Sequence, residues 1–440
     1  MRHLILAAAA LSLLSSPGAG ATGPHAKGAS DAHLMRSRGS VWQADRDNDG
    51  LTDEEEARLG TSPTDPDSDD DALLDGWEVR GVNGIDLAGM GALPLHKDLF
   101  VEMDFMVRSS AANGLGPNDA VLRGIAAVFA AAPVTNPDNR PGINVHLERG
   151  NQVVYDSDLN PLLTEFGALK RANFDTRRAP VFHYMIWANG YDGDTSSGYS
   201  MAIPGADFVV TLGKWNGGNG GTDNQKIGTF VHELGHNLGL RHGGSDAENF
   251  KPNHLSVMNY SFQTRGILHD NGRAYDYQRF PLPALPEAAL READGLGRGA
   301  ALQTYNTIFY SGQSAFEVPC HDAIDWNRNG TINTSTVSLN LNSGNTISTL
   351  SATPNEWASV SYDGGAIGSR LSPAAALNMA ARRWRRFRFK ELTEEMDRRV
   401  GEYLLRGERS GNSSRRELDE ETDREIERAL RRGRRRRARP

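Results

Sequence analysis

The stretch HELGHNLGLRH, which runs from His232 to His242, decides both the fold and the chemistry that we expect of this chain. On a helix, His232 and His236 lie one turn apart and face the same way, so both rings can reach one ion at about 2.0–2.1 Å. Gly239 lets the chain leave the helix in a conformation that other residues resist, which would return His242 to the same ion. Glu233 would lie beside the metal, where a carboxylate can accept the proton of a zinc-bound water. Three protein ligands and one open position are typical of a catalytic zinc site.

The residues around this stretch predict the helix that carries it. Thr222 or Asp223 can cap its start. Apolar residues follow a 3.6-residue period and predict a buried stripe beside the histidines, formed by Ile227, Phe230, Val231, Leu234 and Leu238. The site is therefore expected on a rigid, buried element.

A second motif follows downstream, where residues 256–260 read SVMNY. Together with the histidine motif, Met258 resembles the methionine turn of the metzincins, a clan of zinc endopeptidases. The resemblance implies that Met258 forms an apolar floor beneath the metal. It also implies that Tyr260 binds the zinc or stabilises the oxyanion, as a tyrosine at this offset does in some families of the clan. Gly243 and Gly244 match none of the best-known families, so the subfamily stays open.

An acidic segment near the N-terminus repeats one spacing of oxygen donors, which is that of a calcium loop. In residues 45–56 the donors are Asp45, Asp47, Asp49, Asp53 and Glu56, with Gly50 at the turn. In residues 67–78 they are Asp67, Asp69, Asp71, Asp75 and Glu78, with Ala72 where glycine is preferred. The segment resembles thrombospondin type 3 repeats, and the resemblance implies calcium at these donors. A merely acidic, solvated linker is the alternative.

A weaker loop covers residues 325–333. It has the same spacing of oxygen donors but only one carboxylate, and calcium affinity depends on the number of charges. An Asx-rich turn is therefore favoured over a third calcium site.

The composition limits the classes of protein to which this chain can belong. Residues 1–21 have the positive start, short apolar run and small-residue end of a secretory signal, and no later apolar run is long enough to span a bilayer. Cys320 is the only cysteine, which excludes an internal disulfide and favours a small buried hydrophobe. A secreted enzyme without disulfides needs other cross-links, and calcium is one candidate.

The formal net charge of −8 is unevenly distributed, because the body is acidic and the C-terminal tail is rich in arginine. We expect the tail to be a charged, solvated helix or a disordered arm. No aromatic stacking platform accompanies the terminal arginines, so specific recognition of nucleic acid is not expected.

Between the acidic segment and the tail, strand and helix patterns alternate, which predicts an α/β fold. Strands are expected at 97–106, 143–148, 181–188 and 206–212, and helices at 118–132 and 160–173. The resemblance implies a metzincin-like zincin fold with a twisted mixed sheet, the zinc helix and a smaller C-terminal subdomain. In such a fold the last strand before the zinc helix borders the cleft, so Asp207–Leu212 is our candidate for main-chain contact with the substrate.

The resulting domain prediction is a signal peptide (1–21), a linker (22–44), tandem calcium repeats (45–80), a catalytic domain (95–372, its upper part ending near 242) and an Arg-rich tail (373–440). The sequence predicts a secreted, calcium-stabilised zinc endopeptidase that acts on proteins or peptides. Two alternatives remain open: a calcium-dependent adhesion or binding protein with a vestigial protease site, and a zinc hydrolase of non-protein amides.

Overall fold

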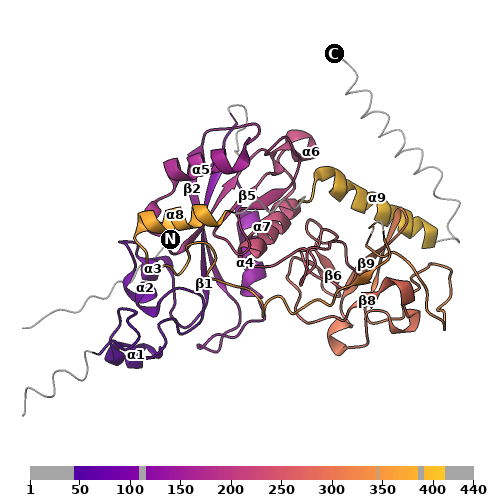
Figure 1. Ribbon diagram of the computed structural model, residues 1–440, viewed down its shortest axis with the longest axis horizontal. Coiled ribbons are helices and arrows are strands. Elements are labelled where there is room, and N and C mark those ends of the chain that lie inside the picture. The colour runs from indigo at the N-terminus through magenta and orange to yellow at the C-terminus, as the bar shows by residue number, and fades with distance from the viewer. Residues whose placement is uncertain (1–43, 109–114, 343, 345, 385–390, 412–440) are drawn as a thin grey trace, which may run out of the picture.

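The computed structural model describes residues 44–108, 115–342, 344, 346–384 and 391–411 (Figure 1). The expected signal peptide, most of the linker and the terminal arginines lie outside these residues. Among the described residues, no helix combines the length and the apolar character needed to cross a bilayer.

A five-stranded mixed sheet is the centre of the fold, in the order β2-β1-β3-β5-β4. Its strands are β1 (Asp98–Met106), β2 (Asn144–Val153), β3 (Phe182–Trp187), β4 (Gly198–Ser200) and β5 (Asp207–Val210). The first four strands in this order run parallel, and β4 pairs antiparallel with β5 at the edge. The α/β class predicted from sequence is therefore confirmed.

The helices also follow the predicted pattern in the first half of the chain. Their bounds are α1 (Asp53–Leu59), α2 (Asp75–Arg80), α3 (Leu87–Met90), α4 (Asp119–Ala130), α5 (Leu162–Asn173), α6 (Trp215–Gly218), α7 (Asp223–Asn237), α8 (Pro373–Arg383) and α9 (Glu394–Gly411). Asn118 caps α4, as its position before the apolar run predicts.

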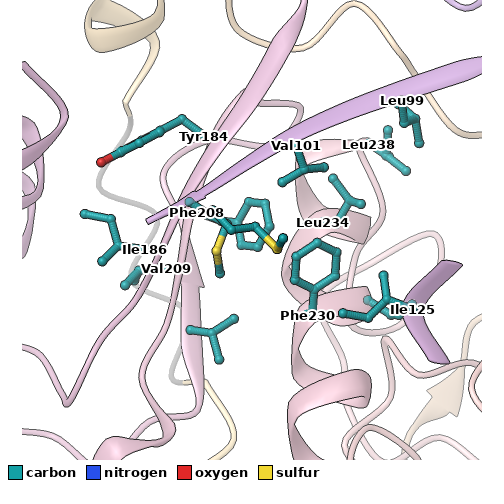
Figure 2. Close-up of a cluster of buried hydrophobic side chains, with 14 of the residues drawn as sticks. Leu99, Val101, Ile125, Tyr184, Ile186, Phe208, Val209, Phe230, Leu234 and Leu238 are labelled. Atoms are coloured by element: carbon teal, nitrogen blue, oxygen red, sulfur yellow. The ribbon is translucent and has the colours of Figure 1, made fainter. Parts of the chain in front are cut away.

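Helices cover both faces of the sheet. Figure 2 shows Phe230, Leu234 and Leu238 of α7 on the same side of the strands as Val101. On the other face, Tyr184 packs its ring against Phe166 of α5. Except for the half-buried Ile227, the predicted stripe of α7 is fully buried, so this helix is held rigidly between the sheet and the segments that follow it.

The chain after α7 builds a second hydrophobic core from short hairpins. Its strands are β6 (Ile267–His269), β7 (Gly272–Ala274), β8 (Leu285–Pro286), β9 (Asn306–Ser311), β10 (Ser314–Pro319) and β11 (Thr349–Leu350). Cys320 is buried in this core, as expected, and burial raises the pKa of its thiol.

One expectation for the chain's layout is wrong, and another holds only in part. Residues 207–210 form β5, which pairs with both β3 and β4, so the strand at the open edge is β4 instead. The described part of the tail is helical, which is one of the two forms expected for it, but its helix α9 is not fully solvated. Helix α9 packs along β10, and Tyr403 and Leu404 join the second core (Figure 1).

Candidate metal centre

Helix α7 places the first two histidines. Thr222 caps its start and forms a reciprocal capping box with Gln225, which supplies partners for backbone groups that a helix end leaves free. Gly235 lets the helix lie directly on the predicted methionine turn, because a Cβ there would stand 2.6 Å from Sδ of the buried Met258. Met258 therefore packs against α7 at Gly235.

Hydrogen bonds orient both rings. Nδ1 of His232 donates to the carbonyl of Val257 at 2.9 Å, and Nδ1 of His236 donates to the carbonyl of Leu240 at 2.8 Å. Each ring then presents its Nε2 lone pair to the site. Burial lowers the pKa of both histidines below the ordinary value, so both rings are neutral at pH 7 and able to bind a metal.

The third histidine arrives through the predicted turn. Gly239 has a φ of +92°, a conformation that favours glycine, and it brings His242 back so that its Nε2 lies 3.0 Å from Nε2 of His236. Behind it, His254 donates through Nδ1 to the carbonyl of His242, and its Nε2 contacts a carboxylate oxygen of Glu356 at 2.8 Å. This buried pair fixes the position of the His242 backbone.

A fourth ligand candidate comes from the far end of the described chain. Glu391, His232, His236 and His242 each offer one ligand atom, and these atoms lie within 4.8 Å of one another. Oε2 of Glu391 lies 3.4 Å from Nε2 of His232 and 3.3 Å from Nε2 of His242. Burial alone would raise the pKa of Glu391, but the histidines outweigh it and hold the pKa well below the ordinary value.

Tyr260 joins the same group. Its hydroxyl lies 3.2 Å from Nε2 of His242 and donates to Oε2 of Glu391 at 3.0 Å. The tyrosine predicted beside the metal therefore lies next to the ligand atoms. Burial, followed by the charge of Glu391, raises the pKa of this hydroxyl well above its ordinary value, so it is a hydrogen-bond donor at pH 7.

Glu233 lies beside this group on the next position of α7. It is fully buried, and neither carboxylate oxygen has a hydrogen-bond partner among the described residues. Burial and then the nearby Glu391 raise its pKa well above the ordinary value. The absence of a side chain at Gly198 makes room for it, since a Cβ there would stand 2.5 Å from Oε1 of Glu233.

These distances fit a zinc ion. Four ligands at about 2.0–2.1 Å in a tetrahedron are separated from one another by about 3.3 Å. The measured separations between Nε2 of His242 and its two neighbours, 3.0 Å to His236 and 3.3 Å to Glu391, are close to that value. His232, His236 and His242 would hold the ion, and Glu391 stands where a fourth ligand belongs.

The first calcium loop gathers some of its predicted donors. Asp45, Asp47 and Asp49 form one group whose ligand atoms lie within 4.8 Å of one another. Glu56 is fully buried with both oxygens unpartnered among the described residues, and burial, reinforced by the aspartates, raises its pKa to about 7. The predicted donor Asp53 has another partner for one of its oxygens, since Oδ2 accepts a hydrogen bond from Nε of Arg46 at 2.8 Å.

The second loop gathers Asp67, Asp69 and Asp71, while Asp71 also groups with Glu78 and with Asp98 of β1. Both oxygens of Glu78 are buried and unpartnered among the described residues. Ala72 has a φ of +71°, which is the strained turn that its place in the loop predicts. The predicted donor Asp75 instead accepts two hydrogen bonds from Ser68.

The weaker loop at 325–333 forms an Asx-rich turn. The two carboxylate oxygens of Asp325 accept from the amides of Asn329 and Gly330. Side-chain oxygens of Asn327 and Asn329 accept from nearby amides as well. Residues 325–331 therefore have the same pattern of Asx hydrogen bonds as residues 45–51 of the first calcium loop.

Sequence reasoning missed two residues of these sites: Glu391 and Asp98. Asp98 left a weak signal, because it is one of the alternating acids in a strand that is otherwise apolar. Glu391 left none, since it lies in a charged tail far from the histidine motif.

The comparisons with known proteins concern the acidic segment. Residues 45–66 match the bacterial TSP3 repeat, so the calcium-binding type of repeat predicted there is confirmed over that range. No curated protein gives a significant match to the chain.

Proposed function

We propose that this chain is a secreted zinc-dependent endopeptidase of metzincin type, stabilised by calcium in its N-terminal repeats. The observation that carries the proposal is the convergence of His232, His236 and His242 on one point, with Glu233 beside them. The positions of Met258 beneath α7 and of Tyr260 against the ligand atoms support the same assignment.

When bound, zinc would act as a Lewis acid toward water and the scissile carbonyl. Glu233 would take a proton from the attacking water, whose oxygen forms the new bond to the carbonyl carbon. The same carboxyl would give that proton to the leaving amine as the C–N bond breaks. A dication on the histidines lowers the pKa of Glu233 by attraction, so it can start as a carboxylate.

Tyr260 would donate a hydrogen bond to the developing oxyanion. Its hydroxyl is protonated at pH 7 and lies within reach of the ligand atoms. The edge strand β4 would pair with the main chain of an extended peptide, because its outer edge faces away from β5.

The test uses the full chain and its Glu391→Gln variant, each loaded with one zinc ion, on a peptide library read by mass spectrometry. We expect zinc-dependent cleavage of peptide bonds that Glu233→Ala abolishes while zinc content stays at one per chain. No cleavage by either protein would refute the proposal. Cleavage of glycan-linked amides instead of peptides would favour the non-protein hydrolase.

A further inference from the structure

Residues 391–393 fill the place that a substrate and an attacking water need. We propose that this segment is a built-in inhibitor, with Glu391 as a fourth metal ligand, and that α9 holds it in the site. The inference rests on the proposed function, because it concerns the regulation of that same site.

The first observation is the position of the carboxylate. Oε2 of Glu391 lies at tetrahedral separation from Nε2 of His232 and of His242. A catalytic zinc site keeps this vertex for water. With Glu391 in this position, a tetrahedral ion would have all four of its ligands. No coordination position would then remain for water.

The second observation is the backbone pairing of the same segment. The carbonyl of Leu392 accepts from the amide of Ser197 at 2.8 Å, and Thr393 forms an antiparallel bridge with Ser196. Ser196 and Ser197 lead directly into β4, the strand at the open edge. An extended peptide substrate is expected to add to this edge in the same manner.

The third observation is that the segment closes the site to solvent. Glu391 is 2% exposed and Leu392 is 0% exposed, while His232 and Glu233 beneath them are each 0% exposed. A peptide substrate cannot reach the histidines until this segment leaves.

The fourth observation is the anchoring of the helix that follows. Asp397 of α9 accepts hydrogen bonds from Oγ1 of Thr264 at 2.6 Å and from Arg265 at 2.7 Å. The carboxylate of Glu394 accepts from the amide of Asn216 at 2.8 Å. These contacts tie α9 to both sides of the site, with Asn216 before α7 and Thr264 after it.

Glu391 competes strongly for the metal because it belongs to the same chain as the histidines. A ligand on the same chain competes with water and substrate at an effective concentration of about millimolar or more. Replacement of Glu391 by glutamine removes the negative charge that favours zinc while it keeps the side chain's size. Loss of this ligand, or of the contacts that hold α9, should therefore release the segment and open the fourth coordination position of the metal.

The experiment uses cobalt in place of zinc, in a Glu233→Ala background that prevents self-cleavage. Acetohydroxamate is the probe, because it binds an open vertex and changes the visible absorption of cobalt. We expect weak or no response with Glu391 present, and at least about tenfold tighter hydroxamate binding in Glu391→Gln, with one cobalt per chain retained. Asp397→Ala, which removes an anchor outside the metal centre, should shift binding in the same direction. Glu395→Gln is the matched control, since Glu395 is half exposed and, within the described part of the chain, forms ion pairs only with Arg398 and Arg399 of its own helix.

Hydroxamate binding that is equally tight with and without Glu391 would overturn the inference. Loss of cobalt from Glu391→Gln would also overturn it, because Glu391 would then be a permanent structural ligand. If the hydroxamate response appears as expected but the Glu391→Gln protein with Glu233 intact cleaves no peptide, the inhibitory ligand stands and the peptidase assignment fails.

Discussion

Two glycines in α9 offer a matched test of how this helix is held. A Cβ at Gly401 would meet nothing within 4 Å, whereas a Cβ at Gly407 would stand 2.0 Å from the carbonyl oxygen of Ala315 in β10. Gly401→Ala therefore changes helix propensity alone. Gly407→Ala changes both helix propensity and the packing of α9 against β10.

The magnitudes follow from these contacts. Alanine favours a helix over glycine by about 0.8–1.0 kcal/mol at either position. At Gly407, the clash with backbone cannot be relieved by a side-chain rotation, so α9 and β10 must move apart, at a cost of about 1–3 kcal/mol. We expect Gly401→Ala to stabilise docked α9 by about 1 kcal/mol and Gly407→Ala to destabilise it by up to about 2 kcal/mol, which is the clash less the gain in propensity.

Hydrogen exchange of the α9 amides, followed by mass spectrometry, measures this directly. Since about 1.4 kcal/mol corresponds to a factor of ten, exchange should slow about fivefold in Gly401→Ala and speed up by as much as about thirtyfold in Gly407→Ala. The hydroxamate response of the cobalt protein should rise in Gly407→Ala alone. Equal protection of α9 in the two variants would refute the docking of this helix against β10.

Two more predictions concern the space around Glu233 and the acidic repeats. In the Glu391→Gln background, Gly198→Ala should displace the Glu233 carboxylate together with the nearby carbonyl of Val209 and lower peptide cleavage by about 100-fold or more, with zinc content unchanged; full activity would show that this space is not needed. In calcium-free protein, the pKa of Glu56 is raised to about 7 from an ordinary 4.5, so its contribution to stability is present below about pH 4.5 and is lost as the pH rises through about 7. Calcium requires the ionised carboxylates, so the gain in melting temperature on adding calcium after EGTA treatment should grow between about pH 5 and about pH 8, and a gain independent of pH would contradict the assignment.

The features that sequence predicted correctly are those with a local cause. The cap at Thr222 and the stripe through Phe230 and Leu234 follow from one helix's own period, and the turn at Gly239 follows from the conformation that glycine permits. The three aspartates that come together in each acidic loop also lie within one short stretch. In each case the residues that act together are close in sequence.

The features that sequence missed depend on which distant segments meet. Strand β4 is only three residues long, too short to show an alternating pattern, so the sequence predicts β5 as the edge strand. Asp98 meets Asp71 only because the repeats dock on the start of β1, where the amide of Asp98 donates to Oδ2 of Asp71 at 2.6 Å. Glu391 reaches the histidines only after the chain has formed the second core, and its own neighbours in sequence do not indicate a metal ligand.

The complete set of four donors raises the question of whether the centre is structural rather than inhibited. Two features favour inhibition. A structural zinc site needs no carboxylate beside its ligands, yet Glu233 is fully buried there, and its oxygens have no side-chain partner among the described residues. Gly198 keeps the space for that carboxylate at the edge strand. The fold keeps the carboxyl group of Glu233 beside three histidines and covers them with the strand-like segment 391–393. This is the arrangement expected of a hydrolase held closed by its own chain.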